Sequence, residues 1–397
     1  MKVTDVETFV VANPPPSLGG RYFIFVRVTS SDGIVGYGEA YAGTFHPEVI
    51  RAAIRDVADR HLIDHDPFDV ERFWRSAYGQ GFTLRPDVSL MGVISALEMA
   101  CWDIMGKSVD KPVYKLLGGR VHDRVRTYTY LYPEEGDRTN VYEDPDLAAQ
   151  RAGQYVVRGF TAVKFDPAGP YTVMGGHQPS QLRIAKSVDF LRSIREAVGD
   201  RADLLFGTHG QFTSSGAIRI AREIAPFDPL WFEEPVPPDD FDGMARVASG
   251  TSIPIAAGER LTTVVEFARL LRAGVRIVQP NLGRAGGILE GKKIAALAAA
   301  HNAQIAPHLY CGPIVGAANI QLATCSPNFL ILEGILDWGG FHARLLRTAI
   351  TWENGYVIPP DAPGLGVELD EDVARAHPYT GDGLHLDMTE RPIDVND

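Results

Sequence analysis

The hydrophobic pattern of the chain changes character near residue 126. From there on, short apolar runs rich in β-branched and aromatic residues alternate with longer segments of helical periodicity. One helical unit is clear, with Asp144 as its N-cap, Pro145 in its first turn and Gly159 at its stop. Eight strands alternating with helices predict an α/β fold, a (β/α)-barrel or modified TIM barrel, although the helix after the seventh strand is weakly signalled. The predicted strands are 126–132, 161–166, 203–207, 230–234, 254–258, 276–280, 303–308 and 329–333.

The N-terminal part lacks this regular alternation. Residues 1–39 follow a β pattern with a turn at 31–33, and three helical segments come after them. We therefore expect an α+β capping domain over 1–120, a barrel over 121–344 and a segment 345–397 that returns to the cap. The helical segments of the cap are 47–62, 67–79 and 88–106.

Polar residues stand at the predicted strand ends. Glu233 and Glu259 stand 26 residues apart, and Gly207 holds the corresponding position 26 residues before Glu233. His308 follows 49 residues after Glu259, close to two such intervals, and Glu333 comes 25 residues later. In a barrel the carboxyl ends of the strands meet on one face, so these residues are expected to converge there. Each carboxylate taken alone is better explained as a helix cap, but the shared register favours a site. Two carboxylates at adjacent strand ends suit a hard cation such as Mg²⁺.

Two loops invite more than one interpretation. The segment 13–20, with three prolines and two glycines, is either a surface linker or a mobile flap. The connection 167–179 is long for a strand-to-helix loop and is either a lid over the site or a disordered insertion. His377 and His385, near the end of the chain, are expected to be surface or packing residues.

The amino-acid composition argues against several classes of partner and of cellular location. The formal net charge of −12 argues against nucleic-acid partners and acidic membrane surfaces, which require a basic face. The three cysteines fit no zinc motif and no disulfide framework, as expected for reduced thiols in a cytoplasmic protein. No signal peptide or membrane span is expected from the sequence.

Several motifs together resemble a known family, the mandelate racemase branch of the enolase superfamily. Within that branch the chain is most similar to galactonate dehydratase and its neighbours. The likeness covers nearly the whole chain, including the predicted cap. It rests on Phe232-Glu233-Glu234-Pro235, Gly258-Glu259-Arg260, Ala285-Gly286-Gly287-Ile288, Ala306-Pro307-His308, Pro363-Gly364-Leu365-Gly366-Val367-Glu368, Ala100-Cys101-Trp102-Asp103-Ile104 and Leu116-Leu117-Gly118-Gly119.

The resemblance implies a reaction and a set of roles. A Mg²⁺ ion, held by Glu233 and Glu259, binds the carboxylate of a sugar acid and stabilises the enediolate formed when the adjacent proton leaves. His308 corresponds to the base that removes this proton, and His209 corresponds to the acid that helps the neighbouring hydroxyl leave. Glu333 corresponds to a glutamate that bonds the substrate carboxylate or the enediolate. The product is a 2-keto-3-deoxy acid, and members of the family are commonly homo-oligomers.

The chain departs from the family pattern at three positions. Gly207 stands where the family has an aspartate ligand, so the third metal ligand is Asp166, His209 or water. Asn281 stands where an aspartate pairs with the base histidine, which makes that histidine a weaker base. Lys164 is present on the second strand, but Asp166 replaces the second lysine of the branch, which argues against a lysine-based racemase.

Other functions remain open at this stage. Lys164, Asn281 and Arg85 are candidate substrate-binding residues, and Arg85 is either a clamp for a distal carboxylate or a surface arginine. A racemase, epimerase or cycloisomerase would share the enediolate step without losing water. A non-catalytic protein that binds an acid sugar is a further alternative, motivated by Gly207 and Asn281.

Overall fold

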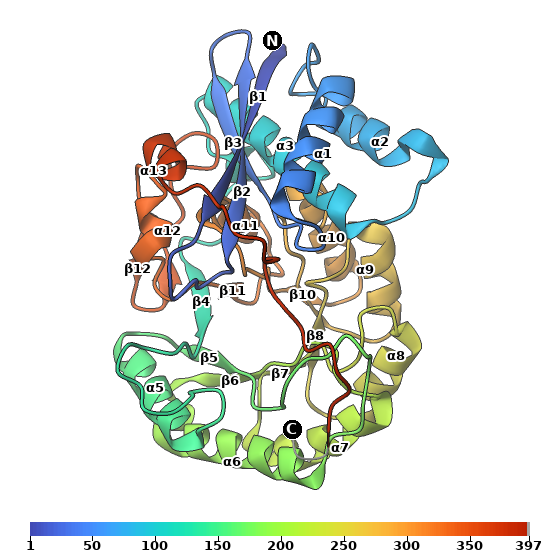
Figure 1. Ribbon diagram of the computed structural model, residues 1–397, viewed down its shortest axis with the longest axis vertical. Helices are drawn as coiled ribbons and strands as arrows, with labels where there is room; N and C mark the ends of the chain where they lie inside the picture. The colour runs from blue at the N-terminus through green and yellow to red at the C-terminus, as the bar shows by residue number, and fades with distance from the viewer. Residues whose placement is uncertain (395–397) are drawn as a thin grey trace.

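The computed structural model describes residues 1–394, which form a cap and a barrel stacked along the long axis of the molecule (Figure 1). The cap is built around an antiparallel sheet in which β2 lies between β1 and β3. Its strands are β1 (Val3–Ala12), β2 (Tyr22–Ser30) and β3 (Val35–Ala40). Its helices are α1 (Pro47–His61), α2 (Val70–Gly79), η1 (Gln80–Phe82), α3 (Val88–Ser108) and α4 (Val113–Leu116).

Helix α3 forms the centre of the cap core. By length and composition this helix could span a membrane, but 78% of its most apolar window is buried inside the protein. It packs directly on strand β3, where Gly36 and Gly38 let the two backbones approach. A Cβ atom added to Gly38 would lie 1.9 Å from the carbonyl oxygen of Ala96. The apolar character of α3 thus follows from its burial between the sheet and the neighbouring helices.

Eight parallel strands form the barrel, and β11 pairs with β4 to join the two ends of the strand order. A parallel bridge between Ile305 and Phe329 joins β10 to the segment that leads into β11. The strands are β4 (Val125–Tyr130), β5 (Ala162–Phe165), β6 (Asp203–Phe206), β7 (Trp231–Glu233), β8 (Ile255–Ala257), β9 (Ile277–Val278), β10 (Gln304–Ile305) and β11 (Leu332–Glu333). The helices of this part are α5 (Pro145–Val157), α6 (Gln181–Val198), η2 (Gly199–Arg201), α7 (Ser214–Ile224), η3 (Ala225–Phe227), α8 (Phe241–Gly250), α9 (Thr263–Arg272), α10 (Gly287–Ala300), α11 (Pro313–Thr324) and α12 (Gly340–Arg344).

The interior of the barrel is filled by one side chain from each strand or its flank. These side chains form a ring of large and small residues that fills the interior and leaves no pore. The ring consists of Tyr128, Ala162, Leu205, Trp231, Ala256, Ile277, Ala306 and Ile331.

The predicted fold class is confirmed, and every predicted barrel strand overlaps an observed one. The weakly signalled helix after the seventh strand is α11. All twelve of its residues are buried, so it has no polar face to produce an amphipathic pattern. Helix α11 contacts strand β4 of the barrel and strand β3 of the cap, which explains why opposite faces of this helix are buried.

The C-terminal segment contacts both parts of the protein. Strands β12 (Trp352–Glu353) and β13 (Tyr356–Val357) extend the barrel sheet beside β4, and α13 (Glu371–Ala376) packs on β1 of the cap. The tail then runs down to the barrel (Figure 1), where the backbone of Thr389 pairs with Tyr171 and Val173 of the long loop after β5. The bounds 1–120, 121–344 and 345–397 stay a prediction.

We expect Gly38→Ala to destabilise the cap, because the added methyl group meets a backbone carbonyl that has no room to move. Overpacking of this kind lowers the free energy of unfolding by about 1–3 kcal/mol. The matched control is Gly153→Ala in α5, where no heavy atom lies within 4 Å of the new Cβ and helix propensity favours alanine. Calorimetry should show a lower melting temperature for Gly38→Ala only, and equal melting temperatures would contradict the close packing of α3 on β3.

Candidate active site

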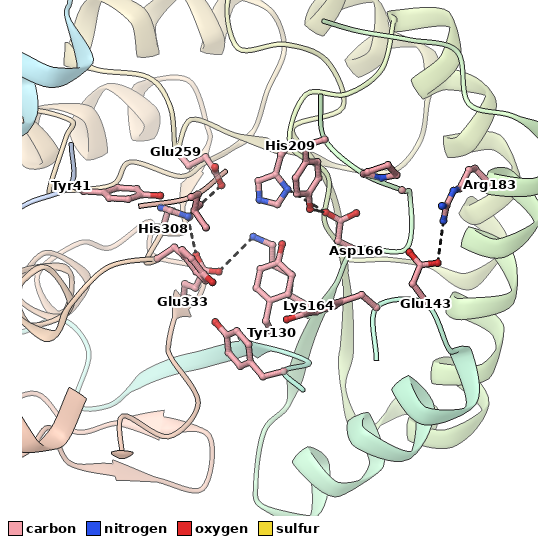
Figure 2. A pocket seen from close by; sticks show the side chains of 17 residues that line it. Tyr41, Tyr130, Glu143, Lys164, Asp166, Arg183, His209, Glu259, His308 and Glu333 are labelled. Atoms are coloured by element: carbon pink, nitrogen blue, oxygen red, sulfur yellow. Dashed lines mark hydrogen bonds and ion pairs between the residues drawn. The ribbon is translucent and has the colours of Figure 1, made fainter. Parts of the chain in front are cut away.

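A cavity of about 450 Å³ lies at the carboxyl ends of the barrel strands, beneath the cap. Figure 2 shows two histidines, His308 and His209, facing it from opposite walls, with Lys164 between them. Tyrosines make up much of the remaining wall, so the cavity has both an apolar lining and hydroxyl groups. The lining residues are Tyr41, Tyr130, Tyr132, Tyr142, Glu143, Lys164, Asp166, Gly169, Pro170, Tyr171, Arg183, His209, Glu259, His308, Tyr310, Glu333 and Leu386.

An ion pair between Lys164 and Glu233 lies at the base of the cavity. Lys164 is part of β5 and Glu233 ends β7, and their side chains meet across β6 with 2.5 Å between Nζ and Oε1. Burial opposes the charge of Lys164, but the carboxylates of Glu233 and Glu333 raise its pKa well above the usual value. The ammonium also lies 3.6 Å from Oε1 of Glu333 and 4.7 Å from the ring centre of Tyr130. Lys164 is therefore a fixed cation in contact with the cavity.

The space above Gly207 is taken by the side chain of Lys164. Gly207 follows β6, the strand between the two partners of the ion pair. A Cβ atom on Gly207 would lie 3.1 Å from the hydroxyl of Tyr130 and 3.2 Å from Cε of Lys164. A side chain at this position would press on the lysine, whose stem would have to shift by a few tenths of an ångström, so the missing aspartate and the placement of Lys164 are linked.

The His308 wall contains two carboxylates and an amide. Nε2 of His308 lies 3.4 Å from Glu259 and 3.8 Å from Glu333. On the other side of the ring, the amide nitrogen of Asn281 lies 2.9 Å from Nδ1, while the Asn281 oxygen accepts a hydrogen bond from the backbone of Gly283. The amide therefore donates to Nδ1, and the neutral imidazole carries its proton on Nε2, which points to the carboxylates. In this state His308 offers a donor, and not a proton acceptor, at Nε2.

The charges of this wall follow from burial and from neighbouring groups. Burial lowers the pKa of His308 to about 3, although Glu259 opposes this shift. Burial alone would raise the pKa of Glu259, but the two histidines and Lys164 outweigh it and lower the pKa. Burial raises the pKa of Glu333 to about 7, with Lys164 opposing the shift. Near neutral pH the wall thus combines a neutral histidine, an ionised Glu259 and a carboxyl group that can hold or release a proton.

The opposite wall pairs His209 with Asp166. Nδ1 of His209 lies 3.3 Å from Oδ2 of Asp166, and the hydroxyl of Tyr171 donates to the same oxygen. The Tyr171 ring packs edge-on to the imidazole at 4.5 Å. Burial opposes protonation of His209, but the hydrogen bond to Asp166 and the charge of Glu259 outweigh it and raise the pKa. This arrangement suits a group that holds a proton and gives it up, because Asp166 stabilises the imidazolium.

The structure brings most of the predicted site residues together. The predicted residues that line the cavity are Lys164, Asp166, His209, Glu259, His308 and Glu333. Glu233 is fully buried and is not a lining residue, since Lys164 lies on it.

Two candidate substrate-binding residues lie outside the cavity lining. Arg85 is exposed and does not line the cavity, because it lies in the exposed segment after η1, where Phe82 and Leu84 have positive φ. Asn281 is fully buried behind His308 and orients that ring, so it does not face the substrate space.

Several cavity residues lie outside the set of catalytic, metal-binding and substrate-binding candidates taken from the sequence. Tyr41 reaches in from the cap and stacks on His308 with ring centres 6.0 Å apart, and the guanidinium of Arg284 lies 3.7 Å from the Tyr41 ring centre. Arg183 and Glu143 pair at 3.4 Å on the outer side of the cavity. Tyr130 carried a usable signal, since it lies near the end of the first predicted strand. Tyr41 and Glu143 come from loops and Arg183 from the first turn of α6, where the strand-end rule gives no guidance.

The oxygen and nitrogen ligands at the cavity only partly fit the Mg²⁺ ion that the resemblance implies. Glu233 and Glu259 each have one buried oxygen with no hydrogen-bond partner among residues 1–394, as a metal site would need. No group of three or more His, Cys, Asp or Glu side chains in the described part of the chain is placed to hold one ion. Asp166 is bonded to His209 and Tyr171 and does not replace the missing ligand. A divalent ion on Glu233 would also lie beside the Lys164 ammonium and be repelled by it. The residues therefore do not complete a magnesium site.

Known protein families match both parts of the chain. Residues 6–118 match the mandelate racemase/muconate lactonizing enzyme N-terminal domain, and residues 147–373 match the enolase C-terminal domain-like family. The D-gluconate/D-galactonate dehydratase of Picrophilus torridus is 34% identical over 96% of this chain and 95% of its own length. The D-gluconate dehydratase of Thermoproteus tenax is 33% identical over 94% of this chain and 72% of its own length.

A solved structure extends this likeness to the whole fold. The mandelate racemase/muconate lactonizing enzyme from Sulfitobacter sp. is 55% identical, with a TM-score of 0.97 over 99% of this chain and 100% of that one. Members of the enolase superfamily generally depend on Mg²⁺, so the donor set described above departs from the rule. The sequence motifs, the capped barrel and these matches agree: the chain belongs to the mandelate racemase/muconate lactonizing enzyme family of the enolase superfamily.

Proposed function

We propose that this chain is a hydro-lyase that dehydrates a sugar acid. The substrate loses the hydrogen next to its carboxylate and the neighbouring hydroxyl group, and becomes a 2-keto-3-deoxy acid. The observation that carries the proposal is the opposed pair of histidines, each beside a carboxylate, on the two walls of one cavity. The dehydratase relatives from Picrophilus torridus and Thermoproteus tenax support the reaction class. A homo-oligomer and a cytoplasmic location stay predictions.

The two walls would divide the proton transfers. His209, protonated and held by Asp166, would give a proton to the leaving hydroxyl. His308 would take the proton from carbon, and this requires an Nε2 without hydrogen. Asn281 must then rotate so that its oxygen accepts from Nδ1, which breaks the hydrogen bond from Gly283. An unsatisfied buried group of this kind costs about 1–3 kcal/mol, so His308 would be a weak base in this protein.

Product analysis tests the reaction class directly. Incubation with D-gluconate, D-galactonate or D-xylonate should give a product whose NMR spectrum contains a C3 methylene group. A change of configuration without a methylene group would instead indicate an epimerase of the same superfamily. Binding of the acid, detected as a rise in melting temperature, without any product would indicate a non-catalytic binding protein.

Single-histidine variants separate the two proton transfers. We expect His308→Ala to lose exchange of the α-proton with D₂O, because the proton acceptor is gone. His209→Asn should keep the exchange and lose elimination, since only the acid for the leaving hydroxyl is removed; general acid catalysis contributes about 10²–10⁴-fold. Deuterium uptake and product formation are followed in the same NMR sample. Equal uptake in wild type and His308→Ala would remove His308 from its role.

Asn281→Asp should reverse the tautomer of His308. A carboxylate accepts from both Gly283 and Nδ1, so Nε2 becomes free to take a proton and the pKa of the imidazole rises above its value of about 3. Selective ¹⁵N labelling of histidine should show the ring proton on Nε2 in the wild type and on Nδ1 in the variant. Asn281→Ala serves as the uncharged control, and His308→Gln assigns the signal. The same tautomer in wild type and Asn281→Asp would contradict the assigned amide orientation.

A further inference from the structure

We propose that the Lys164 ammonium, held on Glu233, replaces the divalent cation of the superfamily as the fixed positive charge that receives the substrate carboxylate. This inference rests on the proposed function for the nature of the ligand. Its central claim concerns the cation alone, and it can be tested without any substrate.

The position of the ammonium supports the replacement. Glu233 ends β7 and is 0% exposed, and the Lys164 side chain is 1% exposed. Nζ lies between Glu233 and Glu333, at 2.5 and 3.6 Å from their nearest oxygens, and the lysine lines the cavity while Glu233 does not. A ligand entering the cavity would therefore meet the ammonium before it could reach the Glu233 carboxylate.

The loss of the third carboxylate supports the same conclusion. Gly207 has no side chain, and the volume that a side chain would use contains Cε of Lys164 and the hydroxyl of Tyr130. An aspartate here would add a second anion to the pocket that holds the ammonium and would also clash with its stem. Gly207 therefore leaves the room that the inward-pointing Lys164 side chain needs. In this arrangement a monovalent organic cation takes the place of an inorganic one.

The rest of the site provides no substitute ligand. Asp166, the remaining carboxylate near the end of β5, accepts from His209 and Tyr171. Glu259 faces His308 at 3.4 Å and Glu333 accepts from the backbone of Leu309. Asp166 and Glu333 thus already accept hydrogen bonds within the protein, and Glu259 lies beside His308, so a metal ion would have to compete with these groups as well as with the ammonium.

The first test is metal binding by the purified full chain, measured by electron paramagnetic resonance during titration with Mn²⁺. We expect no saturable Mn²⁺ uptake by the wild type after dialysis against EDTA. The double variant Lys164→Ala, Gly207→Asp removes the ammonium together with its stem and supplies a third carboxylate, and it should bind one Mn²⁺ per chain. Lys115→Ala, at a lysine outside the site, is the matched control and should behave as the wild type. Stoichiometric Mn²⁺ binding by the wild type that is lost in Glu233→Gln would overturn the proposal.

The second test measures ligand binding without metal. D-gluconate should raise the melting temperature of the wild type equally in EDTA and in millimolar Mg²⁺, while Lys164→Met should bind it about 100-fold more weakly. Lys164→Arg, which keeps the charge and guards against a folding defect in Lys164→Met, should retain most of the binding. A gluconate shift that appears only with Mg²⁺ would overturn the proposal. If D-gluconate and the other two acids give no shift in any condition, the proposed substrate class fails, and the Mn²⁺ titration still decides the role of Lys164.

Discussion

A buried ammonium–carboxylate pair at the mouth of the barrel is the constraint on which the rest of the site depends. Removing either Lys164 or Glu233 would leave an uncompensated charge in the protein interior, at a cost of about 3–5 kcal/mol. The ring of Tyr130 and the carboxylate of Glu333 complete the surroundings of the ammonium. The bare backbone at Gly207 gives the lysine stem room to pass over β6. Five strands of the barrel, β4, β5, β6, β7 and β11, thus contribute to one electrostatic arrangement.

The two histidines receive different roles because one partner accepts a hydrogen bond from the ring and the other donates one to it. Asp166 can only accept, so it holds a proton on Nδ1 of His209 and favours the charged ring. Asn281 donates to His308, because Gly283 occupies its oxygen, and this places the proton of the neutral ring on Nε2. The difference between one carboxylate and one amide therefore decides which side of the cavity supplies protons and how readily the other side can accept them.

Three distant parts of the chain close the cavity. Tyr41 comes from the cap and Leu386 from the C-terminal tail, and the tail is tied to the cap by an ion pair between Arg21 and Asp387. Backbone hydrogen bonds join the tail to the long loop after β5, and Figure 1 shows the tail crossing from cap to barrel. Side chains that line the cavity lower the local dielectric relative to water, and a lower dielectric strengthens charge interactions.

The sequence alone determined the order of elements and most of the site. The alternation of strands and helices, the polar residues at successive strand ends and the family motifs depend on local pattern, and the barrel geometry brings strand ends to one face. Side-chain direction was decided only by the tertiary structure. Lys164 points to Glu233, and Asn281 presents its nitrogen to His308, because of partners on other strands. The exposure of Arg85 and the burial of every residue of α11 likewise depend on what lies beside them in space, and a pattern read along one segment carries no information about that.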